Sequence, residues 1–155
     1  AYLHPLAFDR FKRAGENLQK LKPGWSFVVY DALRPRSVQR KMYAFVKGTP
    51  QQKYVGNPES GSMHNFGFAL DLSLLDENGE PVDMGAGYDD FREISQPKLE
   101  EKFLASGELT RGQWENRQVL KKAMEEAGFR QLSIEWWHFD AFPQGEVRKK
   151  HRIVE

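Results

Sequence analysis

The chain has 155 residues, of which 39% are hydrophobic and 13% aromatic, so it can bury the core of one compact domain. Its 23 basic and 22 acidic residues leave a net charge of +1, which provides no long-range field for nucleic acid or an anionic membrane. There is no cysteine, which excludes disulfides, thiolate metal sites and cysteine-protease chemistry.

Hydrophobic periodicity predicts a series of alternating helices and strands. In chain order these are a helix over 6–21, a short central strand over 26–30, a helix over about 37–47, a strand over 68–75, a short returning strand over 81–84, a helix over about 97–106, a helix over 110–127 and a last strand over about 131–139. The helix over 37–47 is expected to bury Val38, Met42 and Phe45. Residues 48–63 are expected to form a loop that serves as a binding wall or lid.

Domain organisation follows from the same pattern. We expect a single domain over residues 1–155, whose polar C-terminal tail, about 143–155, trails along the surface. No apolar run is long enough to span a membrane, and no signal peptide is recognised. Because the chain begins with Ala1 rather than Met, a processed N-terminus is one interpretation.

Arg34 is a candidate functional residue because of its position. It lies between the strand over 26–30 and the following helix, and Pro35 biases it toward an extended conformation. An arginine at such a turn can point into a cleft. A surface ion pair is the alternative interpretation.

Two distant segments supply the residues of a metal site. In the strand over 68–75, apolar residues alternate with small ones, which places Asp71 on the face of the small residues, where a carboxylate needs a cation or a donor. His64 precedes this strand, and Glu135 and His138 lie far downstream. Three ligands around Zn²⁺, with the fourth position open to water and a carboxylate nearby as base, make a hydrolytic site.

The role of Glu135 leaves two alternatives. An unligated Glu135 could accept a proton and pass it to a leaving amine, whereas a ligated Glu135 would close the site and make it structural. On a regular strand Glu135 and His138 face opposite ways, so the strand must twist, bulge or end there for both to reach one site. Histidines buried for purely structural reasons are a third possibility, which predicts no bound metal.

The assembled motifs resemble a known family. Ser62-x-His64-x-x-Gly67-x-Ala69-x-Asp71, together with Glu135-Trp136-Trp137-His138, resembles the signature of the zinc-dependent D-alanyl-D-alanine peptidases. The segment from Tyr30 to Pro35 resembles the dipeptidase (VanX-type) branch, and the resemblance covers about Tyr2 to His138. It implies an α+β fold with a central, mainly antiparallel sheet flanked by helices, as in the D-Ala-D-Ala peptidase/hedgehog-like superfamily.

The resemblance also implies roles for individual residues and one Zn²⁺ per chain. These are metal binding by His64, Asp71 and His138, general acid/base catalysis by Glu135, transition-state stabilisation by Arg34, and substrate binding by Asp89 and Ser62. Asp90 remains an alternative to Asp89 as the residue that binds the substrate amine. The expected substrate is a small D-amino-acid dipeptide, above all D-Ala-D-Ala.

Rival functions stay open at this stage. A carboxypeptidase or endopeptidase acting on peptidoglycan stem peptides would not need the amine-binding acid. A zinc-containing binding module without peptidase activity, as the hedgehog signalling domains suggest, is a further alternative. The sequence leaves open the bacterial compartment, cytoplasm or periplasm, and the oligomeric state.

Overall fold

The structure is a computed structural model that describes all 155 residues. An antiparallel sheet of four strands, in the order β1-β2-β4-β3, lies at its centre. The strands are Ser26–Asp31 (β1), Ala69–Leu75 (β2), Arg130–Gln131 (β3) and His138–Asp140 (β4). The helices are Pro5–Leu21 (α1), Arg36–Val46 (α2), Glu100–Ser106 (α3), Arg111–Glu125 (α4) and Gln144–Lys150 (α5). The predicted α+β class with an antiparallel sheet is therefore confirmed.

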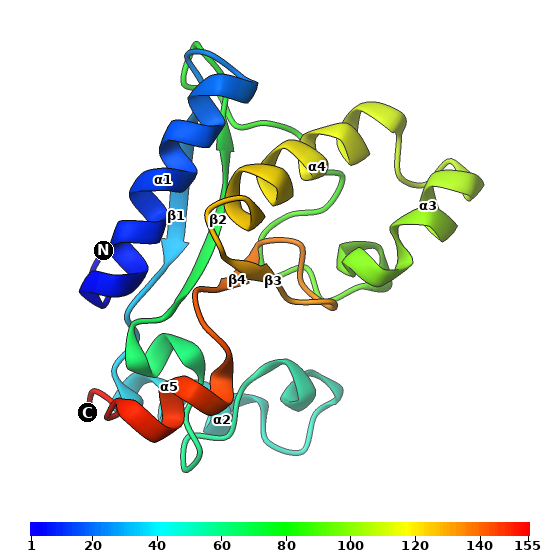
Figure 1. Ribbon diagram of the computed structural model, residues 1–155. Coiled ribbons are helices and arrows are strands. Elements are labelled where there is room, and N and C mark those ends of the chain that lie inside the picture. Colours follow the sequence, from blue (N-terminus) through cyan, green and yellow to red (C-terminus); the bar gives the residue numbers. More distant parts are fainter.

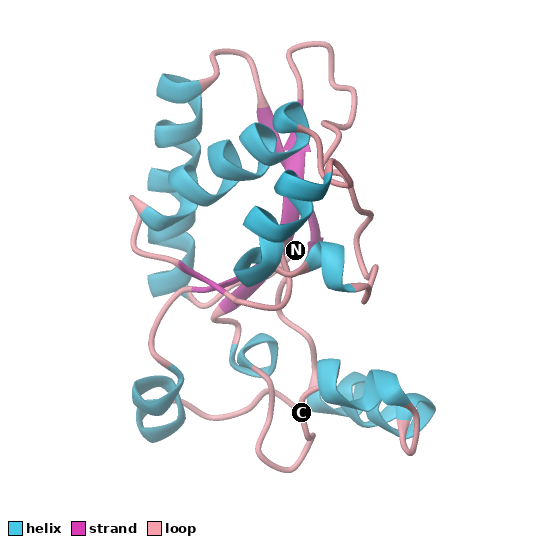
Figure 2. Cartoon of the chain, turned by 90° about the vertical axis from the view of Figure 1, so that its right-hand side faces the viewer, coloured by secondary structure: helices cyan, strands magenta, loops and turns pink.

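The helices fall into two groups around the sheet. Helices α1 and α4 pack against one another beside the long β1–β2 pair, and α3 lies beyond α4 (Figure 1). Helices α2 and α5 lie at the opposite end of the molecule, among long loops (Figure 2). Four short 3₁₀ turns connect these parts: Pro50–Tyr54 (η1), Met63–Phe66 (η2), Glu93–Ser95 (η3) and Pro97–Leu99 (η4). No helix of the chain is both long and apolar enough to cross a bilayer.

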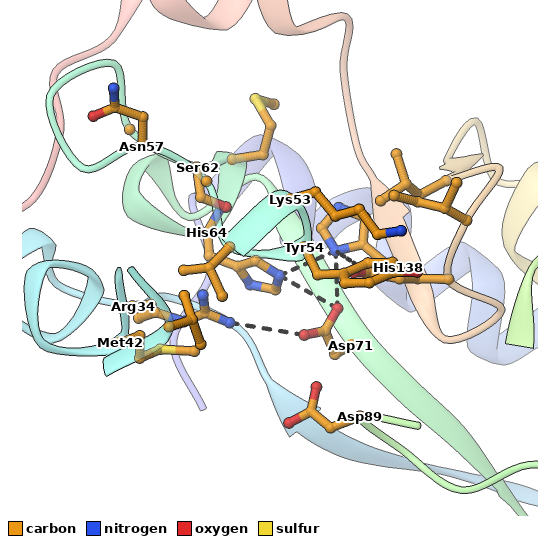
Figure 3. Close-up of a pocket in the computed structure, with 18 of the residues that line it drawn as sticks. Arg34, Met42, Lys53, Tyr54, Asn57, Ser62, His64, Asp71, Asp89 and His138 are labelled. Atoms are coloured by element: carbon orange, nitrogen blue, oxygen red, sulfur yellow. Dashed lines mark hydrogen bonds and ion pairs between the residues drawn. The ribbon is translucent and has the colours of Figure 1, made fainter. Parts of the chain in front are cut away.

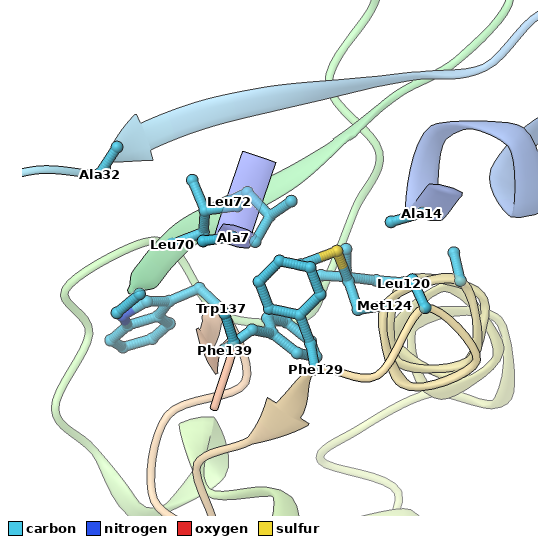
Figure 4. Close-up of a cluster of buried hydrophobic side chains, with 14 of the residues drawn as sticks. Ala7, Ala14, Ala32, Leu70, Leu72, Leu120, Met124, Phe129, Trp137 and Phe139 are labelled. Carbon is cyan, nitrogen blue, oxygen red and sulfur yellow. The ribbon is translucent and has the colours of Figure 1, made fainter. Parts of the chain in front are cut away.

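The main hydrophobic core lies between β2 and the α1–α4 pair. Leu70 and Leu72 of β2 are buried together with Ala14 of α1 and Leu120 of α4 (Figure 4). This follows from the sequence, because alternate residues of a strand point to one face and the apolar positions of β2 alternate. The opposite face of β2 is left for Asp71, as the alternation predicts.

Two predictions about the N-terminal half are wrong. Strand β1 pairs only with β2 and forms an edge of the sheet, rather than a central strand. Helix α2 exposes Phe45 (89%) and Val38 (43%), whereas polar Gln39 is its buried residue. Met42, Phe45 and Val46 of this helix line a cavity instead of packing into the main core.

Three predictions about other segments also need correction. The strand predicted over 131–139 is two short strands, β3 and β4, joined by a turn. The strand predicted over 81–84 is only a single bridge between Leu75 and Pro81. The polar C-terminal segment predicted over about 143–155 contains a helix that the sequence did not indicate, α5 over Gln144–Lys150, which buries Val147.

Candidate metal centre and catalytic site

The sheet register places two of the candidate ligands side by side. Asp71 of β2 pairs directly with His138 of β4, and Asp31 of β1 pairs with Asp71 from the other side. Directly opposed residues have their side chains on the same face of a sheet and about 5 Å apart. The three strands therefore present a row of polar side chains on the face away from the main core.

The third candidate ligand comes from the turn η2, just before β2. Ser62 caps this turn, and its hydroxyl accepts a hydrogen bond from the backbone N–H of His64 at 3.4 Å. The side-chain oxygen of Asn65 accepts from the backbone N–H of Ser62 at 2.7 Å, which completes a capping box. Gly67 then turns the chain into β2 with a φ of 73°, a left-handed conformation that favours glycine. This rigid turn holds His64 over β2.

His64, Asp71 and His138 form a tight, buried cluster (Figure 3). Asp71 Oδ1 lies 2.9 Å from His138 Nδ1 and 3.3 Å from His64 Nε2, and these two nitrogens are 3.2 Å apart. One donor atom from each residue lies within 4.8 Å of the other two, so the group could hold a metal ion. This is the ligand set that the sequence predicts.

The other nitrogen of each imidazole has a partner that fixes its orientation. His64 Nδ1 lies 2.7 Å from the carbonyl oxygen of Ala32, to which its N–H can donate. His138 Nε2 lies 3.0 Å from Asp140 Oδ1. With the proton of each neutral imidazole on its outer nitrogen, the inner nitrogens can act as lone-pair donors to a metal ion, as ligating histidines do. Sequence analysis did not identify Asp140, although its position two residues after His138 on one strand gives it the same face.

Asp71 and His138 shift each other's pKa values when no metal is bound. Burial alone would lower the pKa of His138, but hydrogen bonds to Asp140 and Asp71 raise that pKa to about 10. Burial alone would raise the pKa of Asp71, but the charge of His64 and hydrogen bonds from both histidines hold this pKa well below its usual range. The site thus keeps a carboxylate anion and a strongly held cation in the place where a metal ion would bind.

Glu135 lies beside the cluster without being one of its three members. It sits in the turn between β3 and β4, and its Oε2 is 3.8 Å from His138 Nδ1. The strand ends before the motif, so Glu135 and His138 reach the same site despite their spacing. Burial raises the pKa of Glu135 from 4.5 to about 7, and the nearby charge of His138 partly opposes this rise. Such a carboxyl can exchange a proton near neutral pH.

Arg34 reaches the site from the turn between β1 and α2. Its Nε donates to Asp31 Oδ2 at 2.7 Å, and its NH1 donates to Gln39 Oε1 at 2.9 Å. Its NH2 lies 3.9 Å from Asp71 Oδ2. The guanidinium is therefore fixed by Asp31 and Gln39 with one edge toward the cluster. Sequence analysis identified neither partner: Gln39 is a polar residue within an apolar helix stripe and Asp31 ends a short strand, and neither position signals this role.

The loop between β2 and α3 brings Asp89 to the cavity that His64, Asp71 and His138 also line (Figure 3). Asp89 has a φ of 59° and is the only residue other than glycine with a positive φ. Burial raises the pKa of Asp89, and the charge of Asp71 adds to this rise. Asp90, the alternative, does not line the cavity and instead pairs with Arg92 through its carboxylate. The structure therefore favours Asp89 over Asp90 as a cavity acid.

All the predicted site residues border one cavity of about 730 Å³. Ser62 lies on its rim with the loop over residues 53–62, as expected for a binding wall. Another wall is apolar and comes from Met42, Phe45 and Val46 of α2. The cavity thus combines a polar floor, built on the sheet, with an apolar side.

A buried His/Asp/His cluster, with an acidic residue and an arginine beside it in an open cavity, has the composition of a metal-dependent hydrolytic site. Sequence comparison then identifies the family. Residues 17–155 match the family described as D-ala-D-ala dipeptidase, so this chain belongs to that family.

Curated relatives agree with this assignment. The chain is 37% identical over 117 residues to a D-alanyl-D-alanine dipeptidase of Escherichia coli, covering 76% of this chain and 55% of the relative. It is 32% identical over 160 residues to a protein of the same name from Synechocystis, covering 84% of this chain and 65% of the relative. A third such protein, from Enterococcus faecalis, is 30% identical over 135 residues, covering 75% and 62% respectively. The chain thus spans less than two thirds of the length of these relatives.

Proposed function

We propose that this chain is a zinc-dependent dipeptidase that hydrolyses small D-amino-acid dipeptides, with D-Ala-D-Ala as the expected substrate. The observation that carries the proposal is the buried cluster of His64, Asp71 and His138, whose donor atoms lie within 4.8 Å of one another. Glu135 stands 3.8 Å from this cluster and shares its cavity. The names of the curated relatives support the same substrate.

The donor set suits zinc. Two imidazole nitrogens and one carboxylate oxygen are ligands that Zn²⁺ accepts, and three protein ligands leave a coordination position for reactants. The outer hydrogen bonds of both imidazoles, to Ala32 and Asp140, support the same interpretation. A bound zinc ion would supply Lewis-acid chemistry, activating the water and polarising the peptide carbonyl.

Three residues of the chain would supply proton transfer, charge stabilisation and binding of the substrate amine. Glu135 accepts a proton from the attacking water as the new C–O bond forms, and it donates that proton to the leaving amine as the C–N bond breaks. Arg34 stabilises the negative charge that develops on the carbonyl oxygen. Asp89 pairs with the free ammonium group of the dipeptide, which selects substrates that carry a charge at that place.

One experiment tests metal and substrate together. The purified chain is analysed for bound metals, and the same sample is assayed against D,D-, L,D- and L,L-dipeptides. We expect about one zinc ion per chain and preferential hydrolysis of D-Ala-D-Ala. Glu135→Ala should keep the zinc and lose hydrolysis, since Glu135 is not among the ligands. A wild-type chain that binds zinc but cleaves no peptide would point to a binding module instead.

The size of the cavity favours a second candidate function. Its volume of about 730 Å³ is in the range of drug-sized ligands, whereas two alanines are much smaller. The apolar wall from α2 offers contacts that D-Ala-D-Ala cannot make. A carboxypeptidase or endopeptidase acting on peptidoglycan stems would use this space. Rapid removal of the terminal residue from a stem pentapeptide, with the dipeptide left intact, would favour this candidate.

A further inference from the structure

The loop that carries Asp89 has no regular secondary structure of its own. It runs over residues 85–93, from Gly85 to the first residue of the turn η3. At its tip Asp89 adopts a left-handed backbone conformation, with a φ of 59°, which is unfavourable for a residue other than glycine. Such a conformation persists only when the surrounding structure holds the loop in place.

One buried side chain, Arg117 of α4, joins the two ends of this loop. Its Nε donates to the carbonyl oxygen of Met84 at 2.7 Å, and its NH1 donates to the carbonyl oxygen of Ile94 at 2.9 Å. Met84 and Ile94 directly flank the loop. Arg117 is only 1% exposed, so these bonds form where water does not compete.

The Arg117 guanidinium is itself held by an acidic residue of α3. Glu100 of α3 accepts from Arg117 NH1 at 3.3 Å, and its second oxygen accepts from Gln118 Nε2 at 3.0 Å. The Arg117 guanidinium also lies 5.9 Å from the ring of Trp136, the neighbour of Glu135 in the sequence. Arg117 thus bonds to both ends of the loop that carries Asp89, and it lies near Trp136, the residue that follows Glu135.

Other side chains of α4 hold only one end of the loop. Asn116 Nδ2 donates to the carbonyl oxygen of Asp83 at 2.9 Å, and Gln113 Nε2 donates to the Asp83 carboxylate at 2.9 Å. Both contacts are near the surface and go to Asp83, at the Met84 end of the loop. Among these α4 residues, Arg117 alone reaches the carbonyl groups on both sides of the loop.

We propose that Arg117 is a positioning residue, which closes the 85–93 loop at its base and thereby sets the place of Asp89 in the cavity. This inference rests on the proposed function, in which Asp89 binds the substrate amine. A planar guanidinium can donate in two fixed directions at once, whereas a lysine ammonium is a compact charge on a flexible stem. Arg117→Lys therefore keeps a cation beside Glu100 but cannot bridge both carbonyl groups.

The test compares wild type and Arg117→Lys as zinc-loaded full chains. Hydrogen-exchange mass spectrometry should show about tenfold faster exchange within 85–93, equivalent to the loss of one hydrogen bond, and unchanged exchange in α1. The KM for D-Ala-D-Ala should rise about tenfold with a much smaller change in kcat, because the amine contact acts in substrate and transition state alike. Gln118→Ala is the matched control, since it removes a bond to Glu100 without touching the loop.

A double-mutant comparison separates positioning from general damage. In an Asp89→Asn background, Arg117→Lys should change KM by less than about twofold, because the group it positions is already gone. An equal rise of KM in both backgrounds, or unchanged exchange in 85–93, would overturn the proposal. Should the lysine variant show no cooperative unfolding transition, Arg117→Gln replaces it in both measurements. If the wild type cleaves no dipeptide, the proposed function fails, while the exchange comparison still decides whether Arg117 holds the loop.

Discussion

Replacing Glu135 with glutamine should stabilise the metal-free protein while it abolishes hydrolysis. Burial raises the pKa of Glu135 from 4.5 to about 7. This rise is equivalent to about 3 kcal/mol in the free energy of unfolding. Because the folded state has the higher pKa, the contribution of the protonated carboxyl is fully present below pH 4.5 and is lost as the pH rises through about 7.

Glutamine keeps the shape of the side chain without the charge, so Glu135→Gln avoids that loss. We expect the metal-free variant to be more stable than the metal-free wild type by up to about 3 kcal/mol at pH 8, and by much less at pH 5. Urea unfolding of chelator-treated protein at the two pH values measures the difference. Glu115→Gln, on the exposed side of α4, controls for the change in net charge.

The zinc-loaded variant supplies the second half of the same experiment. Loss of the proton carrier should lower kcat for D-Ala-D-Ala by about 10²- to 10⁴-fold while zinc content stays the same. A Glu135→Gln protein that unfolds at the same urea concentration as wild type at pH 8 would show that the carboxylate is not desolvated. Full activity in that variant would remove Glu135 from the proposed proton transfer.

Three further outcomes follow from the geometry. Gly67→Ala should lower the free energy of unfolding by about 2 kcal/mol, because its φ is 73° and a Cβ would lie 3.0 Å from a backbone nitrogen. Gly87→Ala, with open space around it, should have little effect in the same urea titration, and equal losses would contradict this reasoning. Asp89→Asn should raise the KM for D-Ala-D-Ala while Asp90→Asn leaves it unchanged; the reverse order would transfer the amine contact to Asp90. Zinc must displace the proton of His138, whose pKa is about 10, so chelator competition should show affinity rising about tenfold per pH unit between about pH 6 and 8. A pH-independent affinity would argue that this proton is absent.

The sequence could predict the site better than the elements around it. His64, Asp71 and His138 belong to motifs whose residue types are dictated by chemistry, and the structure brings these three together. Alternation in β2 also placed Asp71 on the correct face. What the sequence could not supply were the partners that hold these groups, such as Asp140 and Gln39. A hydrogen bond of that kind depends on tertiary placement and leaves no periodic pattern.

The wrong predictions have physical reasons of the same kind. An apolar stripe on a helix shows which side avoids water, but not whether the chain or a cavity covers that side. In α2 that side, with Phe45, borders the cavity. Strand β1 was expected to be central because of its composition, yet strand order depends on how later segments return. Helix α5 was missed because a polar helix with one buried residue, Val147, has almost no hydrophobic period.

The arrangement of the site depends on the register of the sheet, and the register depends on the core. Asp71 meets His138 and Asp31 only because β2 pairs with β4 and β1 at those positions. A slip by one residue would turn Asp71 toward the core and bring Leu70 or Leu72 to the cavity. Burial of both leucines at 1% exposure or less opposes any such slip. The hydrophobic alternation that stabilises the sheet therefore also fixes the ligand geometry, so core substitutions in β2 should impair metal binding through register rather than through contact.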